Sequence, residues 1–253
     1  MLYPNNFPVP LKLIEETNST NTYLMNLCIE QKETEELTTV VAEFQTAGRG
    51  QRGNFWESEP NQNLLFSFVF RPLFLDAKKQ FLLSQIVSLA IKEELDCYIQ
   101  DVSIKWPNDI YVGQKKICGI LIEHDLMGKN ICQSIAGIGI NINQDRFHSS
   151  APNPVSLTQL TGKKYDALDI LKGIMLRFQE YYKLLKDNQI EIITTHYTHS
   201  LFRKEGFYNY RDNKGEFIAR IVTVEPSGLF VLEDDKGCKR EYLFKEVEYI
   251  IIK

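Results

Sequence analysis

The sequence predicts an α+β fold with a small β-barrel at its C-terminal end. Three observations lead to this class. Apolar, β-branched runs alternate with segments of helical spacing through most of the chain. Short turns join consecutive strands in the middle of the chain, which is typical of antiparallel pairing. The last segment holds short strands separated by turn residues, a pattern typical of small barrels. We expect one domain over residues 1–203 and the barrel over 204–253.

The composition is that of a globular protein. Of 253 residues, 43% are hydrophobic and 25% are charged, which excludes a disordered tail, a collagen-like repeat and a membrane bundle. Lys and Arg number 29 against 33 Asp and Glu, for a net charge of −4. Because no basic excess is available to neutralise a phosphate backbone, we expect no DNA partner.

The cysteines and the chain start indicate the compartment. Five scattered cysteines form no C-x-x-C pair, as is typical of reduced thiols. The start lacks the pattern of a signal peptide, and no apolar stretch approaches the roughly 20 residues of a membrane span. We therefore expect a cytoplasmic protein without a membrane partner.

Strands and helices alternate in the N-terminal part. Residues 11–15 and 38–44 have the apolar, β-branched character of strands, and 64–71 is typical of a buried strand. Between the first two, residues 17–21 carry side-chain oxygens of the kind that cap helices, and the segment after them has helical spacing. Asp76 is expected to open a long amphipathic helix.

Three strands follow, at 102–112, 115–123 and 131–141. The first is expected to continue unbroken through Asp109. The tight turn Gly113-Gln114 then leads into the second strand. We expect these strands to form an antiparallel sheet.

The same turn sets the register of the first two strands. It places Asn108 opposite Gly119 and gathers Asn108, Asp109 and Lys116 in one place, although the local pattern does not choose between Lys115 and Lys116.

In this register Lys105 faces Ile122, about 20 Å from Lys116 at roughly 3.3 Å per residue. We therefore expect Lys105 to be structural or to support the site from behind. The two lysines should not share one phosphate.

The rest of the chain is predicted to be a loop, helices and the barrel. Residues 144–156 contain Pro, Ser and Asn and are expected to form a loop, and 166–199 has the pattern of one or two helices. The barrel strands are expected at 206–211, 216–224, 229–233 and 239–243.

A glycine- and arginine-rich loop carries the first chemical signal. Gly48-Arg49-Gly50-Gln51-Arg52-Gly53 combines glycines, which let a ligand approach the backbone, with two arginines that can hold phosphate or carboxylate oxygens. It is neither a Walker loop nor a G-x-G-x-x-G motif that opens a helix. The alternative is a flexible surface loop with solvated arginines.

Polar residues and glycines also interrupt the predicted central strands. They occur in Lys105-Trp106-Pro107-Asn108-Asp109, in Lys116-Ile117-Cys118-Gly119 and in Gly137-Ile138-Gly139-Ile140-Asn141. Glycine inside a buried strand often marks the close approach of another group. These segments therefore point to a binding site built on the sheet.

In this order the motifs resemble those of the biotin protein ligases, which join biotin to a lysine of a carrier domain through biotinyl-5′-AMP. The resemblance covers nearly the whole chain, and K-W-P-N-D at 105–109 together with the G-R-G loop is its most specific part. It implies a mixed α/β domain related to class II aminoacyl-tRNA synthetases, followed by an SH3-like barrel. It also implies ATP as cosubstrate, Mg²⁺ on the phosphates through ligands that the sequence does not name, and a biotin carboxyl carrier protein as partner.

The resemblance also assigns roles to single residues. Lys116 and Arg49 would be catalytic, with Lys116 on the biotin carboxylate and the α-phosphate. Biotin would be held by Ser19, Thr20, Asn21, Gln45, Gly48, Arg49, Gly50, Gln51, Lys116, Gly137 and Gly139. The adenylate would be bound by Arg52, Asn54, Trp56, Asn108 and Asn141.

The chain departs from many members of the family in two ways. It has Gln51 and Asn54 where they often carry arginines linked to retention of the adenylate. It also begins with the predicted strand and not with a winged helix, so we expect a form without an N-terminal DNA-binding domain. A homodimer is among the oligomeric states that the sequence leaves open.

Other interpretations are open for the function and for single residues. A lipoate or octanoate ligase or transferase would share the superfamily fold, and a non-enzymatic biotin- or nucleotide-dependent regulator would need a partner-binding module. Ser19 and Thr20 could serve only as helix caps. Trp56 could be only a core residue. The pair His196 and His199 lacks a third metal ligand.

Overall fold

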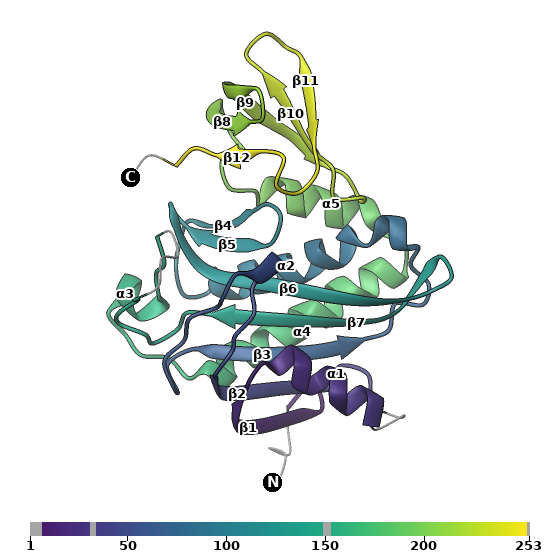
Figure 1. Ribbon diagram of the computed structural model, residues 1–253, viewed down its shortest axis with the longest axis vertical. Coiled ribbons are helices and arrows are strands. Elements are labelled where there is room, and N and C mark those ends of the chain that lie inside the picture. Colours follow the sequence, from purple (N-terminus) through teal and green to yellow (C-terminus); the bar gives the residue numbers. More distant parts are fainter. Residues whose placement is uncertain (1–6, 31–33, 149–152, 252–253) are drawn as a thin grey trace.

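Figure 1 shows the computed structural model, which describes residues 7–30, 34–148 and 153–251. Within these residues, seven strands form one sheet in the order β1-β2-β3-β7-β6-β5-β4. The strands are β1 (Leu11–Thr17), β2 (Thr39–Gln45), β3 (Leu64–Phe70), β4 (Val102–Lys105), β5 (Asp109–Val112), β6 (Lys115–Met127) and β7 (Asn130–Ile140). β1 and β2 are parallel, and every other neighbouring pair is antiparallel. The sheet is therefore mixed, which agrees with the mixed α/β domain that the motifs imply.

Helices cover both faces of the sheet, with α1 on one face and α2 and α4 on the other (Figure 1). The helices are α1 (Thr20–Glu30), α2 (Phe81–Leu95), α3 (Leu157–Thr161), α4 (Ala167–Lys186) and α5 (Ile190–His199), with short 3₁₀ turns at Gln51–Gly53 and Ala77–Lys79. β3 is buried along its whole length, as its apolar sequence predicts for a strand covered on both faces. The side chain of Asp76 caps the 3₁₀ turn that precedes α2.

The expected single strand over residues 102–112 is wrong. The chain reverses after Lys105, so β4 and β5 form an antiparallel hairpin in which Lys105 pairs with Asp109. The reversal contains Trp106 and Pro107, joined by a cis peptide bond. Proline has no N–H to donate to a strand ladder, which explains why the strand stops there.

The register at the next turn also differs from the expected one. Tyr111 pairs with Lys116, and a bulge between Ile110 and Tyr111 shifts the partners of Ile110 and Asp109 by one residue. Asp109 and not Asn108 therefore faces Gly119. Together with the hairpin, this shift brings Lys105 to the same end of the sheet as Lys116.

The C-terminal segment forms a second, antiparallel sheet in the order β11-β10-β9-β8-β12. Its strands are β8 (Tyr208–Asp212), β9 (Gly215–Val224), β10 (Phe230–Asp234), β11 (Lys239–Tyr242) and β12 (Glu248–Tyr249), the last of which was not expected. Among the described residues the edge strands β11 and β12 do not pair, so backbone hydrogen bonds do not close the sheet into a barrel.

The two sheets share one hydrophobic core. Trp106, in the turn between β4 and β5, stacks on Phe230 of β10 with ring centroids 4.7 Å apart. The domain boundary at residues 203 and 204 therefore remains a prediction.

No helix in the described part of the chain is long and apolar enough to cross a membrane.

Candidate active site

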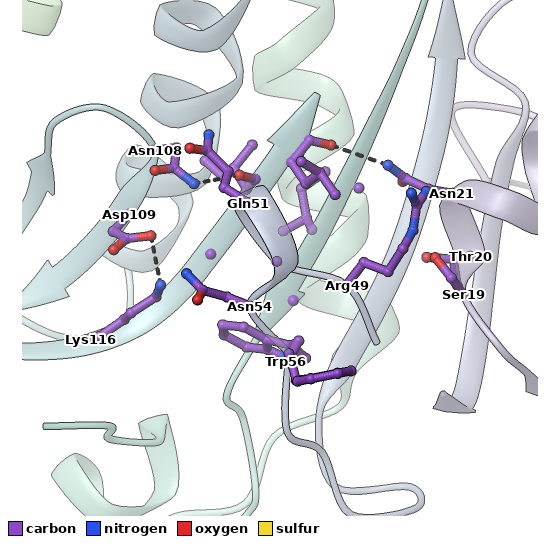
Figure 2. Close-up of a pocket in the computed structure, with 18 of the residues that line it drawn as sticks. Ser19, Thr20, Asn21, Arg49, Gln51, Asn54, Trp56, Asn108, Asp109 and Lys116 are labelled. Atoms are coloured by element: carbon purple, nitrogen blue, oxygen red, sulfur yellow. Dashed lines mark hydrogen bonds and ion pairs between the residues drawn. The ribbon is translucent and has the colours of Figure 1, made fainter. Parts of the chain in front are cut away.

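One pocket collects most of the residues that the sequence singled out (Figure 2). It is built from the start of α1, the loop after β2, the turn between β4 and β5, and the strands β6 and β7. The predicted residues that line it are Ser19, Thr20, Asn21, Gln45, Arg49, Gly50, Gln51, Asn54, Trp56, Asn108, Lys116, Gly137 and Gly139. Segments far apart in the sequence thus meet at one site.

A chain of polar side chains fixes the α1 end of the pocket. The side-chain oxygen of Gln45 accepts hydrogen bonds from the amide and the hydroxyl of Thr20, at 2.7 and 3.1 Å. The buried hydroxyl of Ser67 lies 2.7 Å from the Thr20 hydroxyl and 2.6 Å from Oδ1 of Asn21. Thr20 is therefore bound into the sheet, and its role exceeds that of a helix cap.

Glycines on β6 and β7 make room for side chains that lie directly on the sheet. A Cβ atom at Gly137 would lie 2.1 Å from Oδ1 of Asn21, and one at Gly139 would lie 2.4 Å from Cε2 of Trp56. At Gly119 the nearest ring atom of Trp56 would be 2.9 Å away. The expectation that these glycines mark a close approach is confirmed. The indole of Trp56 covers the sheet and forms part of the pocket wall.

Lys116 and Asn108 lie on the opposite side of the pocket from α1 (Figure 2). Nζ of Lys116 forms an ion pair of 2.7 Å with Oδ1 of Asp109, and it lies 5.7 Å from the ring centroid of Trp56. The side-chain amide of Asn108 donates to the carbonyl of Ile120 at 2.7 Å. The ammonium group therefore lies in the pocket with its orientation set by a carboxylate.

Lys105 also lines this pocket, contrary to the expectation from the sequence. Its Nζ lies 5.3 Å from the ring centroid of Tyr111 and 4.9 Å from that of Tyr249 on β12. Burial lowers the pKa of Lys105, and the nearby carboxylate of Asp109 partly opposes this effect. Pro107 was the signal in the sequence that could have revealed the reversal and hence this position.

Arg49 lies on the α1 side of the pocket and extends toward Asn21 (Figure 2). Its Nη1 and Nη2 contact the two carboxylate oxygens of Glu123 at 3.1 and 2.8 Å. Glu123 lies on β6 and also accepts a hydrogen bond of 2.8 Å from Nδ2 of Asn21. Sequence reasoning missed Glu123, because a glutamate on a half-buried strand looks like an ordinary surface charge. It missed Phe244 as well, which follows β11 and lines the pocket.

Two predicted residues, Gly48 and Asn141, do not line the pocket, and a third cannot be placed. A Cβ at Gly48 would lie 2.7 Å from the carbonyl oxygen of Trp56, so this glycine allows the loop to fold back on itself. Asn141 is buried and donates to the carbonyl of Val155 at 3.1 Å. The side chain of Arg52 lies outside the described part of the structure.

The buried thiol of Cys118 and the pair His196 and His199 lie outside the pocket lining. Burial raises the pKa of the Cys118 thiol well above its usual range, in keeping with the packing role of a buried thiol. Nδ1 of His196 lies 3.0 Å from the hydroxyl of Tyr181. Among the described residues, no group of three or more His, Cys, Asp and Glu side chains could hold a metal ion.

Comparison with known proteins agrees with this arrangement. Residues 13–141, which include most of the pocket, match the profile of the Biotin/lipoate A/B protein ligase family. The chain belongs to this family. The resemblance found in the motifs is thereby confirmed at the level of the family.

Relatives of this family member include the bifunctional ligase/repressor BirA of Bacillus subtilis, 31% identical over 82% of the chain. The chain spans 65% of the length of that relative. The biotin–[acetyl-CoA-carboxylase] ligase of Paracoccus denitrificans is 29% identical over 78% of the chain and 81% of the relative. Among solved structures, biotin protein ligase from Aquifex aeolicus in complex with biotin and ATP has a TM-score of 0.77 and 26% identity, covering 95% of this chain and 99% of the other.

Proposed function

We propose that this family member is an ATP-dependent biotin protein ligase. It would activate biotin as biotinyl-5′-AMP and transfer the biotinyl group to a lysine of a biotin carboxyl carrier protein. The observation that carries the proposal is the meeting of the G-R-G loop, the K-W-P-N-D turn and Lys116 in one pocket. The biotin and ATP bound in the Aquifex ligase, and the carboxylase named as the target of the Paracoccus ligase, support the choice of substrates.

The first half-reaction is the attack of the biotin carboxylate on the α-phosphorus of ATP, with pyrophosphate as leaving group. Two anions must approach each other, so positive charge has to offset their repulsion and the charge of the transition state. Lys116 and Arg49 are the proposed catalytic cations, on opposite sides of the pocket. Lys105 is a third cation, at the end of the pocket that faces the C-terminal sheet.

The second half-reaction needs little from the chain beyond positioning. The neutral amine of the carrier lysine attacks the acyl carbon of the mixed anhydride, AMP leaves with the electron pair of the broken bond, and the amine nitrogen gives up one proton to solvent as the amide forms. The proposed binding residues hold biotin at the α1 end, with Ser19, Thr20, Asn21 and Gln45. Asn54, Trp56 and Asn108 would attend the adenylate.

Mg²⁺ is the expected metal cofactor. Asp109 is the one acidic side chain among the described lining residues. Mg²⁺ in nucleotide sites is usually held by one or two carboxylates together with phosphate oxygens, so this donor set fits. When bound, Mg²⁺ would offset phosphate charge, and Asp109, which also pairs with Lys116 at 2.7 Å, would be its protein ligand.

Incubation with ATP, Mg²⁺ and either biotin or lipoate tests the proposal. Mass spectrometry should detect biotinyl-5′-AMP and, with a carrier domain present, a biotinylated lysine. Lipoyl-5′-AMP formed in preference to the biotin product would favour the lipoate or octanoate ligase alternative, since the family name covers both. Binding of biotin without any adenylate would favour a non-enzymatic regulator.

We propose further that the protein is cytoplasmic and does not bind DNA, because its net charge is −4 and it has scattered cysteines without a C-x-x-C pair. A division into residues 1–203 and 204–253 and a homodimeric state also remain proposals. Sedimentation velocity with and without ligands would decide the oligomeric state.

A further inference from the structure

One carboxylate outside the pocket contacts two residues that line it. Glu123 accepts from Nη1 and Nη2 of Arg49, at 3.1 and 2.8 Å, and from Nδ2 of Asn21, at 2.8 Å. Arg49 belongs to the loop after β2, and Asn21 belongs to the first turn of α1. Glu123 thus ties a loop and a helix to the central strand β6.

The contact uses a particular edge of the guanidinium group. A guanidinium has five N–H donors, and the contact through both Nη atoms takes one from each. The Nε–H and the remaining Nη hydrogens are left for other partners. Nε–H and one Nη–H point in the same direction, which is the fork that a carboxylate or phosphate accepts through two oxygens.

We propose that Glu123 is a positioning residue that acts through Arg49. It holds the end of the guanidinium against β6, so that the side edge of Arg49 faces the pocket and is ready for the anionic group of the ligand. This inference rests on the proposed function. It assigns a role to a residue that does not itself touch the substrate.

Two features favour positioning over competition with the ligand. Glu123 does not line the pocket, whereas Arg49 and Asn21 both do, so its carboxylate lies behind them. Glu123 pairs with Ile135 of β7 in the antiparallel ladder, so it provides a fixed anchor for a loop that contains three glycines. A residue that blocked the ligand would have to occupy the pocket.

The test is a double-mutant cycle with Glu123→Gln and Arg49→Ala. Steady-state kinetics of pyrophosphate release would be measured for both single variants and the double variant. We expect Glu123→Gln to lower kcat/KM for biotin about tenfold, mainly through KM, because a neutral amide no longer holds the guanidinium at two points. In the Arg49→Ala background the same substitution should change kcat/KM less than twofold.

Glu233→Gln is a matched control. Glu233 pairs with Arg220 at 2.7 Å on the C-terminal sheet and has a similar exposure, 24% against 29% for Glu123. It should leave the kinetics unchanged. Glu123→Asp keeps the charge but shortens the side chain, and it should recover part of the loss.

Two outcomes would overturn the inference. Tighter biotin binding in Glu123→Gln would identify Glu123 as a competitor of the ligand. Equal losses in the wild-type and Arg49→Ala backgrounds would show a structural effect that does not act through Arg49.

The rate of trypsin cleavage after Arg49 tests this inference without any enzyme activity, so its result is independent of the proposed function. Trypsin cleaves after arginines that are free to enter its binding pocket, so Glu123→Gln should speed cleavage between Arg49 and Gly50 at least threefold in the absence of any ligand. An unchanged cleavage rate contradicts the ion pair itself. Absence of any adenylate from the wild-type protein contradicts the proposed function and leaves the cleavage result valid.

Discussion

Lys105 and Tyr249 meet at the boundary between the two sheets, with the ammonium nitrogen 4.9 Å from the centroid of the phenol ring. The lysine comes from the hairpin that borders the pocket, and the tyrosine comes from the last strand of the chain. A cation over an aromatic face is stabilised by the ring quadrupole. The C-terminal sheet therefore contributes to the placement of a pocket cation.

Tyr249→Leu should raise KM for ATP about three- to tenfold, because loss of a cation–π contact of ~0.5–1.5 kcal/mol frees Lys105. Tyr249→Phe keeps the ring and should leave KM unchanged. The Tyr249 hydroxyl is buried without a hydrogen-bond partner among the described residues, so its removal should not lower the melting temperature. Equal KM values in the two variants would contradict the role of the ring.

The pH dependence of ATP binding should report on Lys105. Burial lowers its pKa, so the ammonium loses its proton at a lower pH than an ordinary lysine does. As pH rises, affinity for ATP should therefore begin to fall at a lower pH than it would if Lys105 had the pKa of an ordinary lysine. Lys105→Arg keeps its charge over this range and should shift the fall to higher pH, as measured by KM for ATP against pH. If KM for ATP rises over the same alkaline pH range in the wild type and in Lys105→Arg, Lys105 is not the group that titrates.

Lys116→Ala should lower the rate of adenylate formation about 10²–10³-fold, the usual scale for removal of one donor that stabilises a transition state. The neighbouring Lys115→Ala is the matched control, because Lys115 is exposed and does not line the pocket. Circular dichroism would verify that both variants fold. Near-normal pyrophosphate release in a folded Lys116→Ala protein would refute the assignment.

Gly139→Ala should destabilise the protein, since the new Cβ would lie 2.4 Å from the indole of Trp56. Overpacking of this kind typically costs about 1–3 kcal/mol. The atoms nearest to the new Cβ all belong to Trp56, so Trp56→Ala should make the Gly139→Ala substitution nearly neutral in thermal unfolding. If Gly139→Ala still lowers the stability of the Trp56→Ala protein, the clash involves a residue other than Trp56.

Gln51→Arg should slow the release of biotinyl-5′-AMP. Gln51 lines the pocket, and a charge-assisted hydrogen bond to the adenylate is worth roughly 1.5–3 kcal/mol. The off-rate would be compared among the wild type, Gln51→Arg and Arg52→Ala. An unchanged rate in Gln51→Arg with a much faster one in Arg52→Ala would show that Arg52 already supplies the charge.

Most strands and helices followed from local patterns, apart from the β4–β5 reversal and β12, whereas the assembly of the pocket depended on contacts between distant segments. Thr20, Arg49, Lys116 and the glycines of β7 were predicted because motifs mark them, and all of them line the pocket. Lys105 was misplaced because apolar and polar residues alternate across a hairpin much as they do along one strand. Only Pro107 distinguishes a hairpin from a single strand here. Glu123 was missed because its partners lie in distant segments of the chain.

The stacking of Trp106 on Phe230 has a consequence for how this protein can change over evolutionary time. The indole belongs to the motif that borders the pocket, yet its face is packed against a different sheet. A substitution at Trp106 therefore alters the packing between the two sheets and, at the same time, the turn that carries Lys105 and Pro107 into the pocket. A C-terminal sheet taken from a distant homologue would need an aromatic residue at the position of Phe230 to keep this contact.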